Sequence, residues 1–381
     1  MKKIYLQIFT LLLILTISIR PTYLVKAHEL ELITAPIAYT CDESGKLVIF
    51  AKNENERRPI ASMTKIMLLL LAFEENARGN LNFEEEILVS QQASSMGGSQ
   101  VFLQANEKYK VSNLIKSIII ASANDASVAI AEQLYGSEEN AVTKMNERAK
   151  ELNLTNTLFA NCTGLPKATQ FSSAKDVAIM FSQLIKHTKY YEFSKIYLDE
   201  LVHPDGQRTT LTNTNKLIRF YEGCDGGKTG FTNEAGFCLV ATAKRAGMRI
   251  ISVIINEKDS KTRFQDCSKL FDYSFENFVS KTVLDQTKPY EVKAKVAHGK
   301  NEFVEVVAQK DFSIIGKRNS KDQIEIELIS NNLKAPVKKG EVVGIFKVYN
   351  NGVLVGQINA LANETVLRES ILDIVKKIVT N

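Results

Sequence analysis

The chain has 381 residues, 45% of them hydrophobic and 24% charged, which excludes a disordered protein and suits one large domain with a smaller one. Its net charge of +5 comes from 48 basic and 43 acidic residues. Four of the basic residues, Lys2, Lys3, Arg20 and Lys26, lie in the first 27 positions, which hold no acid. The remainder therefore carries 44 basic and 43 acidic residues, or +1. This balance gives no support to a nucleic-acid partner, and none is expected.

Residues 1–27 have the features of a secretory signal peptide. Lys2 and Lys3 precede a mainly apolar run over residues 4–19, and Val25-Lys26-Ala27 is a small-residue cleavage site. The alternative is an uncleaved transmembrane anchor, although the run is slightly short of the ~20 residues that span a bilayer. Either way, the rest of the chain is expected outside the cytoplasm.

Residues 28–280 mix long helical patterns with strands. A helix starting near Ser62 is apolar on all sides over residues 66–71, which predicts a helix buried at the centre of a large domain. Further helices are expected over 112–120, 124–134 and 142–152. Apolar runs at 237–243 and 249–255 flank Arg245-Ala246-Gly247 and predict a β-hairpin.

Residues 285–360 have a different pattern, with short alternating stretches at 290–296, 303–307, 323–328 and 342–348. Turns such as His298-Gly299 and Asn351-Gly352 separate some of them. This pattern predicts a small all-β domain built from hairpins.

The tail over residues 363–381 has apolar residues at steps of three and four, from Leu367 to Val379, with charged residues between them. That spacing predicts an amphipathic helix. Periodicity alone does not decide between a helix packed on the β domain and one lying in a membrane surface.

Five cysteines are scattered along the chain, and none forms a CxxC pair. A metal site or a dense disulfide framework is therefore not expected, and no cofactor is implied. The sequence does not decide whether one pair of these cysteines forms a disulfide in an oxidising compartment. The five are Cys41, Cys162, Cys224, Cys238 and Cys267.

The first motif that carries chemistry is Ser62-Met63-Thr64-Lys65, an SxxK pattern. Residues three apart share one face of a helix, which places the Lys65 amine beside the Ser62 hydroxyl. A serine becomes a strong nucleophile when a neighbouring base takes its proton. Lysine can be that base if burial or nearby cations lower its pKa, and the apolar helix after Lys65 would provide the burial. The helix N-terminus at Ser62 would also favour an oxyanion.

The second motif is Ser122-Ala123-Asn124, an SxN pattern between two helical stretches. Side chains two apart in a loop can enter one cleft, where Ser122 could relay a proton and Asn124 could hold a substrate amide. The alternative is that Asn124 is a helix N-cap.

The third motif is Lys228-Thr229-Gly230, preceded by Gly226-Gly227. Lys228 and Thr229 can bind a carboxylate, and Gly230 permits close approach of a ligand to the backbone. The alternative is an ordinary turn before a strand.

Each motif is weak alone, because the chain holds a second SxxK at Ser172-Ser173-Ala174-Lys175 and a second SxN at Ser330-Asn331-Asn332. The ordered set beginning at Ser62, Ser122 and Lys228, with gaps of 60 and 106 residues, is the complete one. On an exported chain, that combination is a strong indication of a serine acyl-enzyme.

The set resembles the motifs of class A β-lactamases and penicillin-binding proteins. The longer context, which includes Ala121–Ala126, Asp225–Thr232 and Phe171–Asp176, resembles the low-molecular-mass penicillin-binding proteins, the D-alanyl-D-alanine carboxypeptidases. That family implies an α/β (α+β) transpeptidase-like catalytic domain, a small all-β C-terminal domain and an amphipathic anchor. It also implies a place at the outer face of the cytoplasmic membrane, in the cell-wall compartment.

The resemblance implies a role for each motif position. Ser62 would form an acyl-enzyme on the penultimate D-Ala of a peptidoglycan stem peptide, Lys65 would take its proton, and Ser122 would pass a proton to the leaving amine. β-Lactams would acylate the same serine. Substrate would be bound by Asn124, Lys228, Thr229, Gly230 and Phe231, with the N–H groups of Ser62 and Phe231 as the oxyanion hole.

One departure from the family is visible, because many relatives have a histidine where this chain has Thr163 in Thr163-Gly164-Leu165. Any role of that histidine cannot be transferred. The sequence also leaves open whether Arg245, Arg249 or Arg263 assists the carboxylate.

Two other functions are weighed against this one. A class A β-lactamase would carry a Glu-x-x-Leu-Asn loop between Ser122 and Lys228, and none is found. A non-catalytic wall-binding protein is disfavoured by the complete motif set. The chain also lacks GxSxG and HExxH, which argues against a Ser-His-Asp hydrolase and a metallopeptidase.

Overall fold

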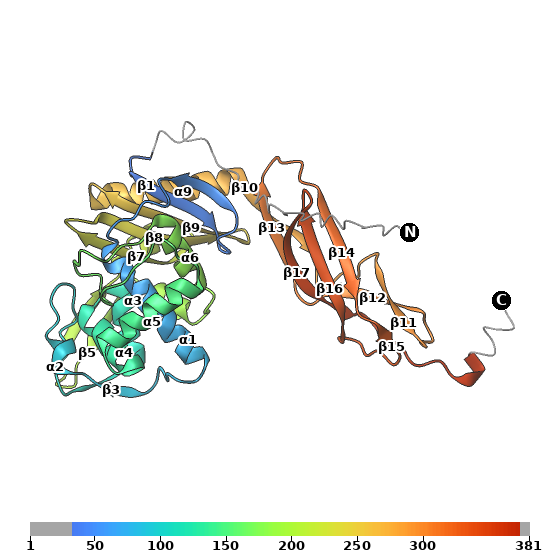
Figure 1. Ribbon diagram of the computed structural model, residues 1–381, viewed down its shortest axis with the longest axis horizontal. Helices are drawn as coiled ribbons and strands as arrows, with labels where there is room; N and C mark the ends of the chain where they lie inside the picture. The colour runs from blue at the N-terminus through green and yellow to red at the C-terminus, as the bar shows by residue number, and fades with distance from the viewer. Residues whose placement is uncertain (1–32, 374–381) are drawn as a thin grey trace, which may run out of the picture. The chain divides into compact units, whose positions relative to one another are not determined.

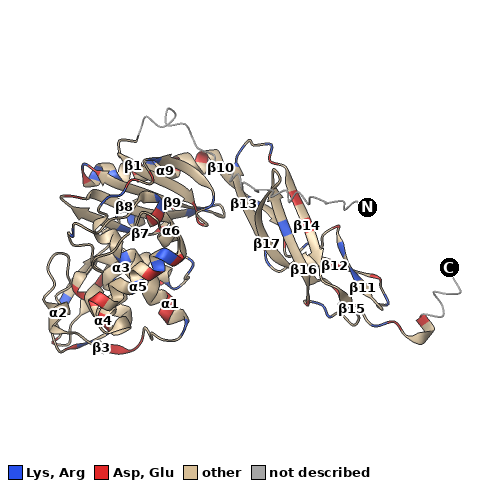
Figure 2. Ribbon diagram, in the orientation of Figure 1, with Lys and Arg blue, Asp and Glu red and all other residues tan. Residues whose placement is uncertain are grey.

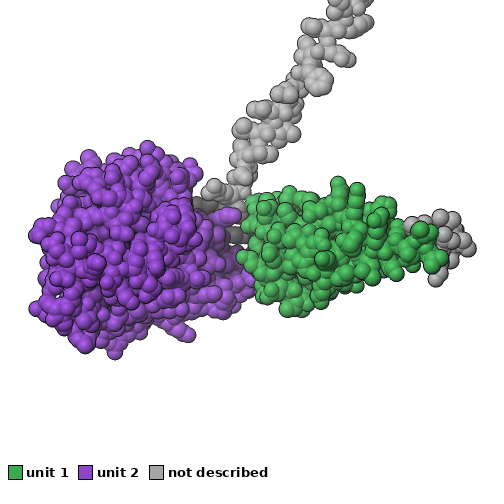
Figure 3. All heavy atoms as spheres, turned by 90° about the horizontal axis from the view of Figure 1, so that it is seen from below, with its two compact units in different colours: residues 1–21, 284–312, 322–381 green, residues 22–283, 313–321 purple. Residues whose placement is uncertain are grey.

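The computed structural model describes residues 33–373, which form two compact units (Figure 3). Among these residues the larger unit comprises 33–283 with 313–321, and the smaller comprises 284–312 with 322–373. Lys and Arg residues are interspersed with Asp and Glu residues along the elements of both (Figure 2). The predicted signal peptide, residues 1–27, lies outside the described residues.

A five-stranded antiparallel sheet organises the larger unit (Figure 1). Its spatial order is β2-β1-β9-β8-β7, so β7, which carries the third motif, is an edge strand. The strands are β1 (Ile37–Asp42), β2 (Val48–Lys52), β7 (Cys224–Thr232), β8 (Gly236–Arg245) and β9 (Met248–Glu257).

Helices cover both faces of this sheet. The C-terminal helix of the unit, α9 (Ser260–Asn277), packs on β8 and β9 on one face, while α6 (Ala174–Leu184) packs on β9 and β1 on the other. Alternate residues of β8 accordingly join different cores, with Val240 on the α6 side and Leu239 on the α9 side. Burial on both faces explains why the strand sequences are continuously apolar.

The predicted central helix is confirmed as α1 (Lys65–Ala77). A short 3₁₀ segment, η2 (Ala61–Thr64), leads into it, and every residue from Lys65 to Phe73 is buried. It packs against α6, α4 (Asn124–Tyr135) and α5 (Glu138–Glu151), and α3 (Val111–Ile120) packs on α4.

Shorter elements complete the larger unit. The helices are α2 (Gln91–Ser94), α7 (Tyr190–Ser194) and α8 (Leu217–Phe220), and the two-stranded ribbons are β3 (Glu86–Leu88) with β4 (Lys108–Lys110) and β5 (Leu198–Val202) with β6 (Arg208–Thr212). A further pair joins β10 (Phe278–Leu284) to β13 (Phe312–Lys317).

The predicted hairpin is confirmed as β8–β9, in which Arg245 pairs with Met248. The two residues between them, Ala246 and Gly247, both have positive φ, +46° and +76°. Two consecutive positive φ values are the mark of a type I′ turn, whose twist matches that of paired strands.

The smaller unit is all-β, as predicted. Its six-stranded sheet has the order β14-β16-β17-β12-β11-β15, and buried side chains such as Val304, Phe346 and Val348 form its core. The strands are β11 (Lys293–Ala297), β12 (Phe303–Ala308), β14 (Ile324–Ser330), β15 (Leu333–Lys334), β16 (Val342–Asn350) and β17 (Val353–Ala362).

The tail differs from its prediction over residues 363–370, which are not helical. Val366 is buried and bridges to Val337, and Arg368 bridges to Gly299, so the chain there is held extended on the β unit. Helical residues begin at Ile371, and residues 374–381 lie outside the described part. No helix among residues 33–373 is long and apolar enough to cross a membrane.

Candidate active site

Ser62 and Lys65 lie at the junction of η2 and α1, where the three-residue spacing brings their side chains together. The Lys65 Nζ is 3.0 Å from the Ser62 Oγ. Ser62 is half-buried and Lys65 is fully buried. The first motif therefore has the geometry of a nucleophile beside a base.

The remaining contacts of Lys65 orient its amine. Its Nζ lies 2.6 Å from the Asn124 Oδ1 and 2.5 Å from the Thr163 carbonyl oxygen. The Asn124 amide faces the lysine with its oxygen because its Nδ2 donates to the Gly97 carbonyl. A neutral amine that donates its two hydrogens to these two acceptors directs its lone pair at Ser62.

Burial lowers the pKa of Lys65 from 10.5 to about 7, partly opposed by the nearby Cys162 and Asp125. An ammonium loses more hydration on burial than an amine does, so the neutral form is favoured. A pKa near neutrality is the value that best suits a general base.

Ser122 lies between α3 and α4 with a positive φ of +64°. Its Oγ accepts a hydrogen bond from the Lys228 Nζ at 2.7 Å. Asn124 is the first residue of α4, and the N-cap is Ala123, without a side-chain cap. The capping interpretation of Asn124 is therefore wrong, because its side chain points to Lys65 instead.

The third motif lies within β7, so the interpretation as a turn is wrong. Lys228 and Thr229 are buried. The pKa of Lys228 is well below its ordinary value because of burial first and then the positive charges of Lys65 and Arg263. The second and third motifs thus meet through the contact between Lys228 and Ser122.

Two glycines let the backbone close around Ser62. A Cβ on Gly230 would lie 2.6 Å from the Ile60 oxygen and 3.2 Å from the Ser62 nitrogen. A Cβ on Gly164, where φ is +84°, would lie 2.0 Å from the Ala61 oxygen. Strand β7 and the loop at Gly164 therefore approach the Ser62 segment at distances that only glycine permits.

Phe231 follows Gly230 and is half exposed, with its ring stacked on Phe237 at 4.3 Å between centroids. Both rings line an open cavity of about 760 Å³ together with Asn233 and Glu257. The cavity is thus one residue along β7 from the glycine that touches Ser62.

Of the three candidate arginines, Arg249 is already neutralised, because it forms two short bonds to the Asp225 carboxylate, at 2.6 and 2.8 Å. Arg245 donates to the Glu222 carbonyl and lies over the rings of Tyr221 and Phe275. Among residues 33–373, neither of these two side chains forms a hydrogen bond with Lys228, Thr229 or Gly230.

Arg263, from α9, lies directly behind the third motif. Its guanidinium donates to the Gly230 and Cys238 carbonyl oxygens, at 3.2 and 3.0 Å. It is buried, and no carboxylate among residues 33–373 forms an ion pair with it. Burial lowers its pKa to about 10. An uncompensated cation beside Lys228 makes this the arginine suited to a substrate carboxylate.

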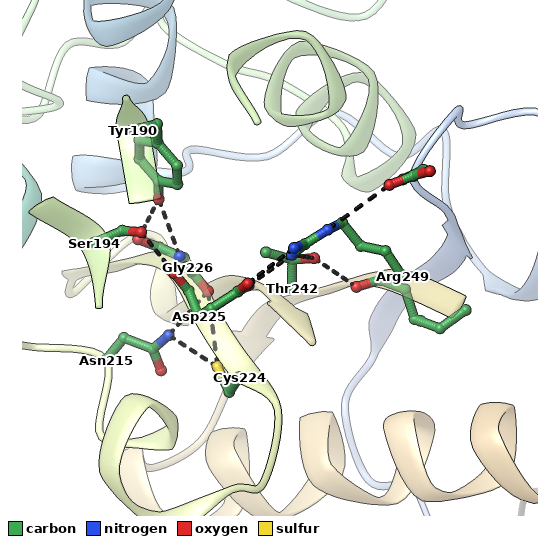
Figure 4. A network of polar contacts seen from close by, with 11 residues as sticks. Tyr190, Ser194, Asn215, Cys224, Asp225, Gly226, Thr242 and Arg249 are labelled. Carbon is green, nitrogen blue, oxygen red and sulfur yellow. Dashed lines mark hydrogen bonds and ion pairs between the residues drawn. The ribbon is translucent and has the colours of Figure 1, made fainter. Parts of the chain in front are cut away.

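A polar network supports the start of β7 (Figure 4). The Tyr190 hydroxyl contacts both the N–H and the carbonyl of Gly227, at 3.1 and 3.4 Å. The Ser194 hydroxyl donates to the Asp225 carbonyl at 2.6 Å, and the Asn215 Nδ2 donates to the Gly226 carbonyl at 3.3 Å.

The second SxxK sequence has a structural role. The Ser172 hydroxyl contacts that of Thr157, and the Ser173 hydroxyl caps α6 by accepting from the Asp176 N–H. Capping is a common role for serine before a helix. The five cysteines are all free and buried, and the described residues contain no cluster of side chains suited to a metal.

Sequence reasoning missed several participants. The carbonyls of Thr163 and Gly97 are backbone acceptors, and residue type does not predict which backbone carbonyl will accept a hydrogen bond. Asp125, which was part of the second motif's context, accepts the N–H groups of Val101 and Leu103 and so fixes the loop beside Asn124.

A buried lysine paired with a serine at a helix start, a second serine–lysine pair, and a mixed α/β sheet domain define a serine acyl-enzyme of the SxxK class. The family model "D-alanyl-D-alanine carboxypeptidase" matches residues 25–259, and the model "Penicillin-binding protein 5, C-terminal domain" matches residues 278–368. The chain belongs to the D-alanyl-D-alanine carboxypeptidase family of serine peptidases, and the resemblance of its motifs to that family is confirmed.

Individual relatives agree. The chain is 38% identical to the D-alanyl-D-alanine carboxypeptidase DacF of Bacillus subtilis over 88% of its own length and 86% of that protein. It is 32% identical to DacC of Escherichia coli, covering 85% and 82% of the two chains. Among solved structures, penicillin-binding protein 5 of Haemophilus influenzae superposes with a TM-score of 0.69 at 28% identity, covering 88% and 98%. The predicted fold class is thereby confirmed.

Proposed function

We propose that the protein removes the terminal D-Ala from peptidoglycan stem peptides that end in D-Ala-D-Ala, through an acyl-enzyme on Ser62. The observation that carries the proposal is the meeting of the three motifs, in which Lys65 contacts Ser62 and Lys228 contacts Ser122. Peptidoglycan and β-lactams are the ligands of this family.

Acylation begins when Lys65 takes the Ser62 proton and Oγ attacks the carbonyl carbon of the penultimate D-Ala. The N–H groups of Ser62 and Phe231 stabilise the oxyanion, since developing charge is best met by fixed donors. The C–N bond then breaks as the proton that Lys65 took from Ser62 passes, by way of the Ser122 hydroxyl, to the leaving amine, while Lys228 orients that hydroxyl. Water then attacks the ester carbonyl and gives a proton to Lys65, and this proton returns to the Ser62 oxygen when the ester C–O bond breaks, which restores both residues.

The terminal carboxylate of the substrate is bound by Lys228, Thr229 and Arg263. A carboxylate bound between Lys228 and Arg263 would bring the negative charge that favours the protonated form of Lys228, so binding of an anion and protonation of Lys228 support each other. Asn124 holds the substrate amide and also orients Lys65, and Gly230 gives the peptide access to the β7 backbone.

Incubation of purified protein with a pentapeptide ending in D-Ala-D-Ala tests the activity by measurement of free D-Ala. Release is expected from the wild type and not from Ser62→Ala, and fluorescent penicillin should label only the former. Rapid turnover of nitrocefin would favour a β-lactamase instead. Labelling that persists in Ser62→Ala would exclude Ser62 as the nucleophile.

We also propose that the protein acts in the cell-wall compartment, at the outer face of the cytoplasmic membrane. The targeting features of residues 1–27 support export. Leu367, Ile371 and Leu372 are 58%, 81% and 75% exposed, which supports contact of the tail with a membrane surface.

A further inference from the structure

The residues before the third motif give β7 little stiffness of its own. Gly226 and Gly227 precede Lys228, and the pairing with β8 shifts register between Cys224 and Gly226. Because two glycines and a bulge precede Lys228 on an edge strand, the backbone of β7 alone does not fix the position of Lys228. The Lys228 Nζ is nevertheless held 2.7 Å from Ser122, which comes from a different part of the fold.

Side chains take the place of a neighbouring strand along this edge. The Gly227 N–H points away from β8 and donates to the Tyr190 hydroxyl at 3.1 Å, and that hydroxyl lies 3.4 Å from the Gly227 carbonyl oxygen. Tyr190 and Ser194 are four apart on α7, so they share a face that meets residues 225–227 (Figure 4). Buried backbone groups need such partners.

The packing at this point is as close as the hydrogen bonding. Tyr190 is buried, and a Cβ on Gly226 would lie 2.9 Å from its ring. A Cβ on Gly227 would lie 2.6 Å from the Asn215 Nδ2. The tyrosine ring therefore fills the space that a side chain at Gly226 would take, and its hydroxyl holds the next residue.

We infer that Tyr190 is a positioning residue, which sets the place of Lys228 and thereby the preference of the site for substrates with a free terminal carboxylate. It touches neither substrate nor Ser62 and acts through the backbone of Gly227. This inference rests on the proposed function, in which Lys228 binds that carboxylate.

The test compares two peptides that differ in one group, an acetylated tripeptide ending in D-Ala-D-Ala and its C-terminal carboxamide. The wild type should hydrolyse the carboxylate form with the higher kcat/KM. In Tyr190→Phe, which removes the hydroxyl alone, this preference should fall about ten-fold, the equivalent of one buried hydrogen bond. General loosening would instead lower kcat/KM for both peptides by the same factor.

Tyr191→Phe is the matched control, since Tyr191 is the next residue on α7 and, within the described part of the chain, its hydroxyl forms no hydrogen bond with β7. The preference of this variant should stay at the wild-type value. Ser194→Ala, which removes the bond to the Asp225 carbonyl, should shift the preference in the same direction by a smaller factor. It also serves if Tyr190→Phe is poorly folded.

Lys228→Ala separates failure of the inference from failure of the proposed function. A preference that is lost in Lys228→Ala but unchanged in both Tyr190→Phe and Ser194→Ala overturns the positioning role alone. A preference that survives Lys228→Ala overturns the assigned role of Lys228 and the inference with it. Equal losses for both peptides in Tyr190→Phe also overturn the inference.

Discussion

Lys65 illustrates how a single residue acquires its chemistry from its surroundings. Its side chain forms no ion pair with a carboxylate among residues 33–373 and is fully buried, so burial is the first cause of its low pKa. Two fixed acceptors, Asn124 and Thr163, then decide where the lone pair points. Burial leaves much of the amine unprotonated at neutral pH, and hydrogen bonding orients its lone pair.

The pKa of about 7 for Lys65 predicts the pH dependence of acylation. The base must be unprotonated, so the second-order rate of penicillin acylation should rise with pH through about 7 and level off above it. Stopped-flow quenching of protein fluorescence, or labelling at timed intervals between pH 5.5 and 9, measures this. A rate that is constant across pH 7, or that falls as pH rises, would exclude neutral Lys65 as the base.

Gly230 provides a second prediction at the residue scale. Gly230→Ala would place a Cβ 2.6 Å from the Ile60 oxygen and should push β7 away from Ser62. Misplacement by about 1 Å costs on the order of 100-fold in rate, so penicillin labelling should slow by about that factor. Gly79→Ala, where a Cβ meets nothing within 4 Å, is the control and should label at the wild-type rate. Similar rates for the two variants would contradict the prediction.

The parts of the site that could be predicted from sequence are those where residue type and spacing carry the chemistry. Ser62 and Lys65 are neighbours because a helical turn makes them so. The role of Thr163 could not be found in this way, because its contribution is a backbone carbonyl. The role of Tyr190 could not be predicted either, because its hydrogen bond to Gly227 spans 37 positions of sequence. In addition, α7 is too short to show a helical period.

At the scale of elements, periodicity predicted the helices and strands that are long and uniformly apolar. The central helix α1 and the hairpin β8–β9 follow from apolar runs, because both are enclosed on all sides. Ribbons of three residues, such as β3 and β4, have too few positions for a period of two to stand out. The start of the tail helix was placed too early, at residue 363, because the apolar spacing that begins at Leu367 was extended back over residues where Val366 and Arg368 form β-bridges.

The β8–β9 turn offers a stability prediction. Ala246 holds a φ of +46°, a region that costs a non-glycine residue ~1–2 kcal/mol. Ala246→Gly removes that strain, but the added entropy of the unfolded chain costs ~0.5–1 kcal/mol. The free energy of unfolding is therefore expected to rise by ~0.5–1 kcal/mol. Calorimetry should show a Tm higher by about 2 °C.

The reverse change one residue later is its control. Gly247→Ala places a Cβ at φ +76° and should lower the Tm. Penicillin labelling rates should be unchanged in both variants, because neither residue belongs to the site. A lower Tm for Ala246→Gly would mean that the turn does not carry the strain its dihedral angles indicate.

At the scale of the whole molecule, each unit keeps its own chemistry. The described residues of the catalytic unit hold all five thiols, every one buried, and burial raises the pKa of Cys41, Cys162 and Cys267 well above the ordinary value. Thiols kept protonated and enclosed are poor nucleophiles, so they can persist unpaired in an oxidising compartment. The described residues of the smaller unit supply none of the residues of the proposed site, and Ile371 and Leu372 are exposed.

Deleting residues 371–381 tests what that tail does. The cut leaves Val366 and Arg368 in their bridges, so the β unit should keep its fold, while the exposed Ile371 and Leu372 are lost. Membrane binding by an amphipathic helix scales with its buried apolar area, so the truncated protein should move from the membrane fraction to the soluble extracytoplasmic fraction. Immunoblotting of the two fractions measures this, and unchanged penicillin labelling confirms an intact catalytic unit. Retention in the membrane after truncation would place the attachment elsewhere, with an uncleaved segment at residues 4–19 as the site to delete next.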